Sequence, residues 1–298
     1  MNDIKARRIV FQGEPGANSH LACREVFPEA EAVPLATFED CFQAIESGEA
    51  DLGMIPIENS VAGRVADIHH LLPASSLSII GEHFLPVRHQ LLAVKGASLD
   101  DIAVVQSHVM ALGQCRKFLR EHGLKAEIAA DTAGSARHVA ELGEPRRAAI
   151  ATSLAGEIYG LDTLARDIED EAHNTTRFIM LSREPRRPAV EAGPAVTSFI
   201  FRVRNVPAAL YKALGGFATN GVNMTKLESY QLGGTFFATQ FYADVEGHPD
   251  DHSLALALEE LEFFSAEFRI VGVYPAHPFR VTQAEPAENR DLRPSRGV

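Results

Sequence analysis

A hydroxyl, a permanent cation and an aromatic ring are neighbours in the segment His173-Asn174-Thr175-Thr176-Arg177-Phe178. The two threonine hydroxyls can donate or accept hydrogen bonds, but they do not ionise usefully near neutral pH. The guanidinium of Arg177 stays charged and can hold a carboxylate with two parallel bonds. This combination predicts an anionic substrate that gains or loses a polar group beside an apolar ring.

A second polar cluster, Pro56-Ile57-Glu58-Asn59-Ser60 followed by Gly63, lies more than a hundred residues upstream. It ends a predicted strand at 50–57. In open α/β sheets, ligands bind at the carboxyl ends of the strands. We therefore expect the two clusters to line one cleft.

Composition restricts the kinds of partner. The chain has 298 residues, of which 46% are hydrophobic and 23% charged, and its formal net charge is −12. The length allows two domains, and the negative charge argues against nucleic acid or an anionic membrane as the main partner. An anionic substrate then needs a local cation, for which Arg177 is the best candidate.

The cysteines and the first residues predict a cytoplasmic location. Cys23, Cys41 and Cys115 are odd in number and widely spaced, which fits free thiols in a reducing compartment. The segment 1–8 lacks the apolar core and cleavage site of a signal peptide. No apolar run is long enough to span a membrane.

Residues 8–181 alternate between strand-like and helix-like segments, which predicts an α/β sheet with helices on both faces. The clearest strands are predicted at 8–11, 50–57, 91–94 and 148–151, and the clearest helices at 19–26, 109–119 and 133–142.

A different order follows a linker at 184–195 that contains three prolines. Residues 196–275 predict the order β-α-β-β-α-β, the ferredoxin-like split unit, with a hairpin at Gly233-Gly234. Residues 276–298 are polar and proline-containing, and we expect them to form a mobile tail.

Four motifs occur in an order typical of one enzyme family. They are Phe11-Gln12-Gly13-Glu14-Pro15-Gly16-Ala17-Asn18-Ser19, Pro56–Ser60, Ser107-His108 with Gln114-Cys115, and Asn174–Phe178. Each motif alone is weak, but together with the split unit they are specific. Over residues 8–275 the chain resembles monofunctional prephenate dehydratases with a C-terminal ACT regulatory domain. Because the first strand starts at residue 8, we do not expect the chorismate mutase helices that some members carry.

The resemblance implies conversion of prephenate to phenylpyruvate, water and carbon dioxide, with no metal or organic cofactor. It also implies a catalytic domain (residues 1–183) of two α/β lobes of the periplasmic-binding-protein kind around a cleft. By resemblance, the catalytic residues are Thr176, Glu58, Asn59 and Ser60, and the substrate-binding residues are Arg177, Phe178, Asn174, Thr175, Ser19, Ser107 and Gln114.

Hydroxide is a poor leaving group, so the site must donate a proton or a strong hydrogen bond to it. We expect the Thr176 hydroxyl to stabilise the departing oxygen, an effect typically worth ~3–4 kcal/mol. Arg177 would hold the pyruvyl carboxylate. Glu58 could act as an acid if its pKa were raised, or it could pair with Arg177 and orient the site, which is the role we favour.

The resemblance further implies a homodimer or homotetramer in which ACT domains pair and bind an amino-acid effector, phenylalanine by expectation. The expected effector residues are Ala208, Ala209, Leu210, Asn223, Met224, Glu228 and Ser229. Ala208 replaces a glycine of the family pattern, and Tyr230-Gln231 replaces Arg-Pro. Both departures leave the affinity for phenylalanine and the sign of the response open.

Two other functions remain open. An arogenate dehydratase would carry the same motifs, and a non-catalytic amino-acid sensor would have the same two-lobed cleft. Taken singly, Asn174–Phe178 could be a plain turn and Pro56–Ser60 a helix cap. His69 and His70 have no metal-ligand pattern around them, and we expect them on the surface. His108 and His173 lie beside motifs, and we expect them to support the site or lie on the surface instead of acting as a base.

Overall fold

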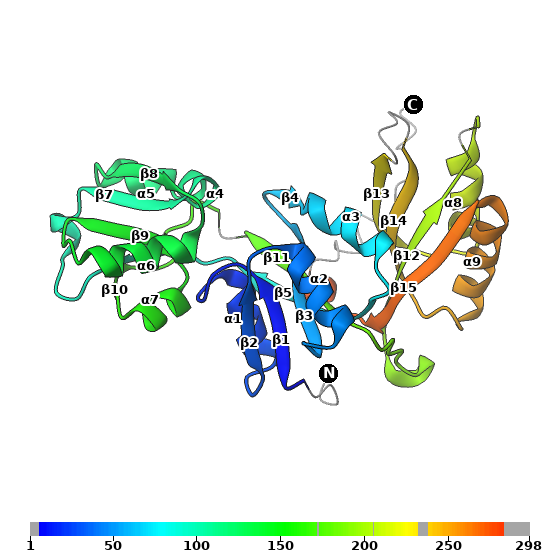
Figure 1. Ribbon diagram of the computed structural model, residues 1–298. Helices are drawn as coiled ribbons and strands as arrows, with labels where there is room; N and C mark the ends of the chain where they lie inside the picture. Colours follow the sequence, from blue (N-terminus) through cyan, green and yellow to red (C-terminus); the bar gives the residue numbers. More distant parts are fainter. Residues whose placement is uncertain (1–5, 172, 205, 232–237, 283–298) are drawn as a thin grey trace, which may run out of the picture.

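The computed structural model describes residues 6–282 except 172, 205 and 232–237. Figure 1 shows three units in a row, with the first lobe in the middle, the second lobe at one end and the split unit at the other. The described strands form a ten-stranded and a five-stranded sheet. None of the described helices is long and apolar enough to cross a bilayer.

The first lobe is built on strands in the order β5-β11-β3-β1-β2. Its elements are β1 (Arg8–Gln12), α1 (Asn18–Val26), β2 (Glu31–Leu35), α2 (Phe38–Ser47), β3 (Leu52–Asn59), β4 (Gly63–Arg64), α3 (Ala66–Ala74), β5 (Ser78–Pro86) and β11 (Thr175–Ser182). β11 returns from the second lobe and lies antiparallel to both β3 and β5. Its apolar residues Phe178 and Met180 pack with Ile9, Phe11 and Met54 in one core.

The second lobe is the five-stranded sheet β10-β6-β9-β7-β8 with its helices. Its elements are β6 (Gln90–Ala93), η1 (Leu99–Asp101), β7 (Val104–His108), α4 (Val109–Gln114), α5 (Arg116–Glu121), β8 (Lys125–Ala129), α6 (Thr132–Leu142), β9 (Arg147–Ala151), α7 (Ser153–Tyr159) and β10 (Asp162–Ala165). The predicted two-lobed α/β architecture is confirmed. The single helix predicted at 109–119 is wrong, because the helix breaks at Cys115, which is fully buried.

The third unit has the predicted order β-α-β-β-α-β. Its elements are β12 (Ala195–Arg202), α8 (Ala209–Thr219), β13 (Met224–Gln231), β14 (Ala238–Glu246), α9 (His252–Phe264) and β15 (Glu267–Pro275). Side chains of α8 and α9 pack on the sheet around Phe199 and Phe201. The predicted turn at Gly233-Gly234 lies outside the described residues.

The first lobe and the third unit share one sheet, although the linker prediction suggested separate bodies. β15 runs parallel to β5, with Gly272 opposite Ile79. A Cβ on Gly272 would lie 2.5 Å from the Ile79 carbonyl oxygen, so only glycine allows this approach. The linker itself contains the short turn η2 (Val190–Ala192).

The prediction of a mobile tail from residue 276 is wrong for residues 276–282. Helix α10 (Phe279–Thr282) follows β15 and packs back on the first lobe. Phe279 stacks on Phe84 with ring centroids 4.7 Å apart. Arg280 forms an ion pair with the buried carboxylate of Glu82, with Nε 2.6 Å from Oε1.

Replacing Gly272 with alanine should loosen the joint between the two units. We expect Gly272→Ala to lower the free energy of unfolding by about 1–3 kcal/mol, the usual cost of overpacking. Thermal and urea unfolding measure it. Gly215→Ala is the matched control, because its Cβ would meet only Glu260 Oε1 at 3.5 Å and alanine favours a helix. Equal stability of the two variants would contradict the close-approach argument.

Candidate active site

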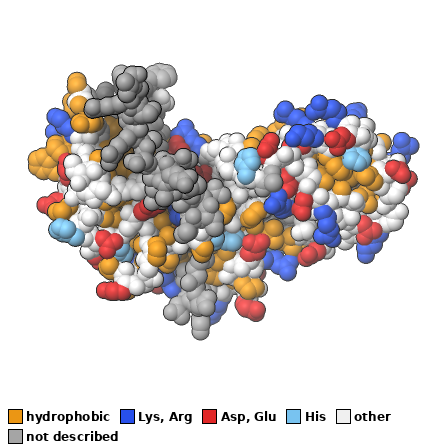
Figure 2. Space-filling view, turned by 180° about the vertical axis from the view of Figure 1, so that it is seen from behind, with side chains coloured by type: hydrophobic (Ala, Val, Ile, Leu, Met, Phe, Trp, Pro, Cys, Tyr) orange, Lys and Arg blue, Asp and Glu red, His pale blue; other side chains and the backbone are white. Residues whose placement is uncertain are grey.

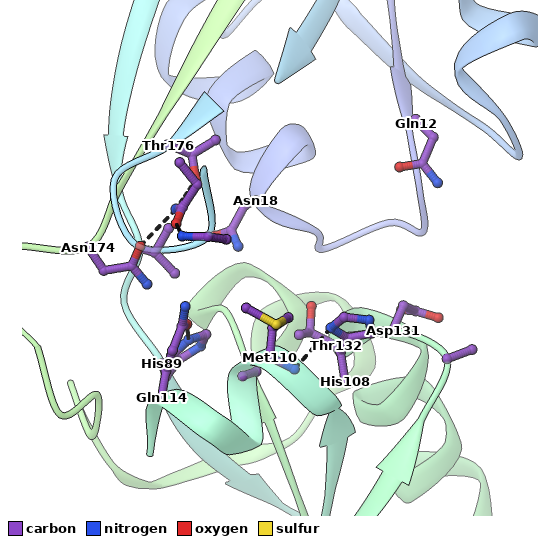
Figure 3. Close-up of a pocket in the computed structure, with 15 residues that line it drawn as sticks. Gln12, Asn18, His89, His108, Met110, Gln114, Asp131, Thr132, Asn174 and Thr176 are labelled. Atoms are coloured by element: carbon purple, nitrogen blue, oxygen red, sulfur yellow. Dashed lines mark hydrogen bonds between the residues drawn. The ribbon is translucent and has the colours of Figure 1, made fainter. Parts of the chain in front are cut away.

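A cavity of about 370 Å³ lies between the two lobes. Its polar residues on the side of the first lobe are Gln12, Asn18, Asn59, Asn174 and Thr176, and those on the opposite side are His89, His108, Gln114, Asp131 and Thr132. Figure 3 shows the two sets facing each other. The cavity therefore joins the two predicted clusters through Asn59 and Thr176.

Strand pairing brings these two residues together from positions 117 apart, because Thr176 on β11 lies opposite Asn59 on β3. Asn59 Oδ1 accepts hydrogen bonds from the backbone N–H groups of Val61 (3.0 Å) and Ala62 (2.8 Å), which fixes the orientation of its amide. Asn59 Nδ2 must then donate to Thr176 Oγ1, at 3.0 Å. Since this oxygen accepts the bond from Asn59, its own O–H remains available to donate into the cavity.

Asn174 presents a second donor to the cavity. The residue is 2% exposed, and its Oδ1 accepts a hydrogen bond from Asn59 Nδ2 at 2.8 Å. Its Nδ2 is buried and has no partner among the described residues, and in Figure 3 it points toward the opposite wall. A buried donor without a partner is costly, so a ligand that accepts this bond is favoured here.

The second lobe contributes two histidines to the cavity lining, His89 and His108. From the sequence, His108 was expected to take no direct part in the chemistry, and His89 was not predicted at all. His108 Nδ1 accepts the backbone N–H of Met110 at 3.3 Å, which leaves Nε2 as the ring's donor. His89 Nε2 lies 2.8 Å from Gln114 Oε1. Burial lowers the pKa of His89, which favours the neutral ring near pH 7. His108 lies in a recognised motif, whereas His89 carries no sequence signal.

Arg177 does not line the cavity, which corrects the prediction that it holds a substrate carboxylate. Successive side chains of a strand point to opposite faces, so Arg177 faces away from Thr176. It is 3% exposed and bonds to Glu82 through Nε (2.8 Å) and to Asp244 and Glu58 through Nη1 (2.6 and 2.9 Å). Three carboxylates already occupy this guanidinium.

Glu58 also lies on that far side, which does not support its predicted catalytic role. Burial alone would raise the pKa of Glu58, but the charges of Arg177 and Lys226 outweigh it and hold the pKa below its usual value. Lys226 Nζ is 2.5 Å from Glu58 Oε2. In the structure Glu58 is paired with Arg177, which is the other role that the sequence allowed.

Ser60 and Thr175 connect the two motifs without lining the cavity. Ser60 Oγ donates to the carbonyl of His173 (3.0 Å) and accepts the N–H of Thr175 (2.9 Å). Thr175 Oγ1 donates to the same carbonyl at 3.3 Å. The Ser60 hydroxyl therefore connects the end of β3 to the start of β11, whereas the Thr175 hydroxyl bonds within its own segment.

Three other predicted substrate contacts are also outside the cavity lining. Ser107 is fully buried and donates to the carbonyl of Ile150 at 2.6 Å. Phe178 belongs to the core of the first lobe, and Ser19 is buried in α1. Gln114, by contrast, lines the cavity as predicted. His69 is buried against Tyr230 instead of lying on the surface, and burial lowers its pKa to about 4.

The cavity lining does not contain Arg177, the cation that the sequence predicted there. In the part of the chain that the structure describes, no Lys or Arg lines it, and Asp131 is its only acidic residue. Figure 2 shows the Lys and Arg side chains of the second lobe spread over its outer surface. An anion in the cavity must therefore be held by N–H and O–H donors such as those of Asn174, His108 and Thr176.

Two α/β lobes around a cleft, with an oriented hydroxyl at the start of β11 beside the carboxyl end of β3, are the arrangement of a cleft enzyme. The family model described as prephenate dehydratase matches residues 9–186. The chain belongs to the prephenate dehydratase family, whose members are lyases.

Similar proteins agree with this assignment. A bifunctional N-acyl-homoserine lactone acylase/prephenate dehydratase from Komagataeibacter europaeus is 51% identical, over 92% of this chain and 98% of that protein. Chloroplastic arogenate dehydratase/prephenate dehydratase 2 from Arabidopsis thaliana is 39% identical, over 90% of this chain and 72% of that protein. The crystal structure of prephenate dehydratase in complex with L-Phe from Arthrobacter aurescens has a TM-score of 0.83 at 32% identity, covering 90% of each chain.

Removing the Thr176 hydroxyl should stop chemistry without unfolding the protein. We expect Thr176→Val to lower kcat by about 10²–10³-fold, the usual cost of losing one oriented donor. Thr175→Val is the matched control, because that hydroxyl bonds to the His173 carbonyl outside the cavity. Steady-state rates and circular dichroism test this. A Thr176→Val enzyme with normal turnover would remove Thr176 from the mechanism.

Glu58→Gln separates an acid role from a pairing role. Because the pKa of Glu58 is lowered, the carboxylate is ionised near neutral pH, and we expect both limbs of the pH–rate profile to remain. At pH 7 the ionised Glu58 carboxylate should stabilise the folded protein by about 1 kcal/mol. This contribution should be lost as the pH falls below about 4.5 and through the lowered pKa of the folded state.

Thermal unfolding of wild type, Glu58→Gln and the exposed control Glu49→Gln at pH 7 and pH 4 measures this contribution. Loss of one limb of the profile in Glu58→Gln would support the acid role instead.

Proposed function

We propose that this chain catalyses the decarboxylative dehydration of prephenate to phenylpyruvate, water and carbon dioxide. The observation that carries the proposal is the Thr176 hydroxyl, whose acceptor side is occupied by Asn59 and whose O–H is available in the cavity between the lobes. Asn59 is in turn fixed by two backbone N–H groups.

The reaction needs little from the protein beyond orientation and one well-placed donor. The bond from the ring to its carboxylate breaks, its electron pair completes the aromatic ring, and the bond from the opposite ring carbon to the hydroxyl breaks. Thr176 donates a hydrogen bond to the oxygen as it leaves. Since a threonine is too weak an acid to give up its proton, the proton that completes the water molecule comes from solvent. Shielding of the ring carboxylate from water favours the loss of carbon dioxide.

A direct assay tests the proposal. Purified protein is incubated with prephenate, and the absorbance of phenylpyruvate is followed, with Thr176→Val as the comparison. Turnover that depends on the Thr176 hydroxyl supports the assignment. Binding of an aromatic amino acid without turnover of either prephenate or its amino analogue would favour the non-catalytic sensor.

A second candidate activity comes from the Komagataeibacter relative, whose name includes N-acyl-homoserine lactone acylase. Among the described residues the three cysteines are buried, and burial raises the pKa of each thiol, to about 12 for Cys41. This disfavours a thiolate nucleophile and leaves the hydroxyls of the cavity lining, Thr176 and Thr132, as candidates. Incubation with such a lactone, with and without the Thr176 hydroxyl, decides whether the activity is present.

We infer that residues 196–275 are an ACT regulatory domain that binds phenylalanine, in a homodimer or homotetramer located in the cytoplasm. The β-α-β-β-α-β order supports this, as does the solved relative described in complex with L-Phe. Of the expected effector residues, Ala208, Ala209 and Leu210 lie at the start of α8, and Asn223 and Met224 at the start of β13.

The far end of β13 is turned toward the catalytic domain. Glu228 forms ion pairs with Lys226 (3.2 Å) and Arg64 (3.3 Å), whereas Ser229 is exposed. The register of β13 shifts between Met224 and Lys226, so that Lys226 and Glu228 face the opposite side of the sheet from Met224. The effector site we propose is therefore centred on the start of α8 and excludes Glu228.

Ala208 is the variable feature of this site. It has φ of 62°, in the left-handed region where a side chain costs about 1–2 kcal/mol. Ala208→Gly, which restores the family glycine, should raise the free energy of unfolding by about 1 kcal/mol and strengthen phenylalanine binding. Ala209→Gly in the helix should do the reverse. Chemical unfolding and calorimetry with phenylalanine and tyrosine measure both, and equal stability of Ala208→Gly and wild type would contradict the strain.

A further inference from the structure

Asp131 occupies an unusual place for a carboxylate in a site that takes an organic anion. It lies between β8 and α6, caps α6 by accepting the N–H of Gly134 at Oδ1 (2.5 Å), and lines the cavity. No ion pair to Asp131 is found among the described side chains, and no Lys or Arg lines the cavity around it. Its negative charge therefore acts on the ligand without a neutralising neighbour in the lining.

The geometry of the substrate directs its side chain toward Asp131. In prephenate the hydroxyl and the side chain are on opposite carbons of the six-membered ring. When the hydroxyl points at Thr176, the opposite ring carbon, which carries both the side chain and the ring carboxylate, lies toward the other end of the cavity. Figure 3 shows Thr176 and Asn174 toward one end, and Asp131 and Gln12 toward the other.

The two candidate substrates differ at this end of the molecule. Prephenate has a keto acid there and carries two negative charges. Arogenate has an amino acid, and its ammonium group lowers the net charge to one. A carboxylate attracts the ammonium and repels the keto acid, because opposite charges at close range favour each other in a partly enclosed site.

Capping does not account for the charge. Aspartate and asparagine are about equally good at a helix N-cap, so the structural role at Gly134 needs a side-chain oxygen and no negative charge. The charge gains only a modest stabilisation from the helix N-terminus, so the carboxylate that lines the cavity stays available to a cationic group on the ligand.

We propose that Asp131 is the specificity-determining residue of this cleft. Its carboxylate pairs with the α-ammonium group of arogenate, so that the chain dehydrates the amino substrate in preference to the keto substrate. This rests on the proposed dehydratase function and decides the substrate that the sequence motifs leave open. Gln12 and Asn18, on the wall of the first lobe, lie in the same cavity and provide neutral donors for the side-chain carboxylate.

The test is Asp131→Asn, which removes the charge and keeps the cap. We expect the ratio of kcat/KM for arogenate to that for prephenate to fall by about 10- to 100-fold, the usual weight of a hydrogen bond to a charged group. The change should come from a loss with arogenate and a gain with prephenate. Asp100→Asn, an exposed carboxylate on the same lobe, makes the same change in net charge outside the cavity and should leave the ratio unchanged.

The outcomes separate the two proposals. If wild-type protein turns over neither substrate, the dehydratase function fails. If it turns over either substrate and Asp131→Asn leaves the ratio as in wild type, the role of Asp131 is overturned while the function stands. The role of Asp131 is also overturned if Asp100→Asn changes the ratio as much as Asp131→Asn does. Unfolding curves of both variants confirm that the cap is intact.

Discussion

The buried guanidinium of Arg177 joins the catalytic lobe to the third unit. It bonds to Glu82 from β5 and to Asp244 and Tyr274 from β14 and β15, and all three partners are almost fully buried. Burial alone would raise the pKa of Asp244, but Arg177 holds it below its usual value. Charges buried in this way are stable only while they are paired, so the two units cannot separate here without exposing or stranding a charge.

This cluster lies one residue from the Thr176 hydroxyl, for which we propose the catalytic role. Arg177 and Thr176 are neighbours in β11 on opposite faces of the sheet, and Asn59, which orients Thr176, follows Glu58 in β3. A shift of the third unit can therefore reach the cavity through β11 and β3 without any contact between effector and substrate. Such coupling requires that the effector bind two arrangements of the units with different affinities.

The cavity solves the problem of binding an anion without a cation in its lining. Asn174, His108 and Thr176 offer N–H and O–H donors, and burial together with their hydrogen bonds keeps the orientation of these donors fixed. Donors that are already oriented pay no reorganisation cost when charge moves during the reaction. The cation that the sequence offered for this task, Arg177, is instead used to hold the sheet together.

The sequence by itself determined the element order, the two lobes, the split unit and the meeting of Asn59 with Thr176. These follow from the periodicity of apolar residues and from motifs at strand ends, which are local properties. Only the tertiary structure decided that β5 and β15 share a sheet, that Arg177 faces three carboxylates, and that Asp131 and His89 line the cavity. Strand residues of period two are sorted between faces only when the pairing partners are known, and those partners come from parts of the chain far apart in sequence.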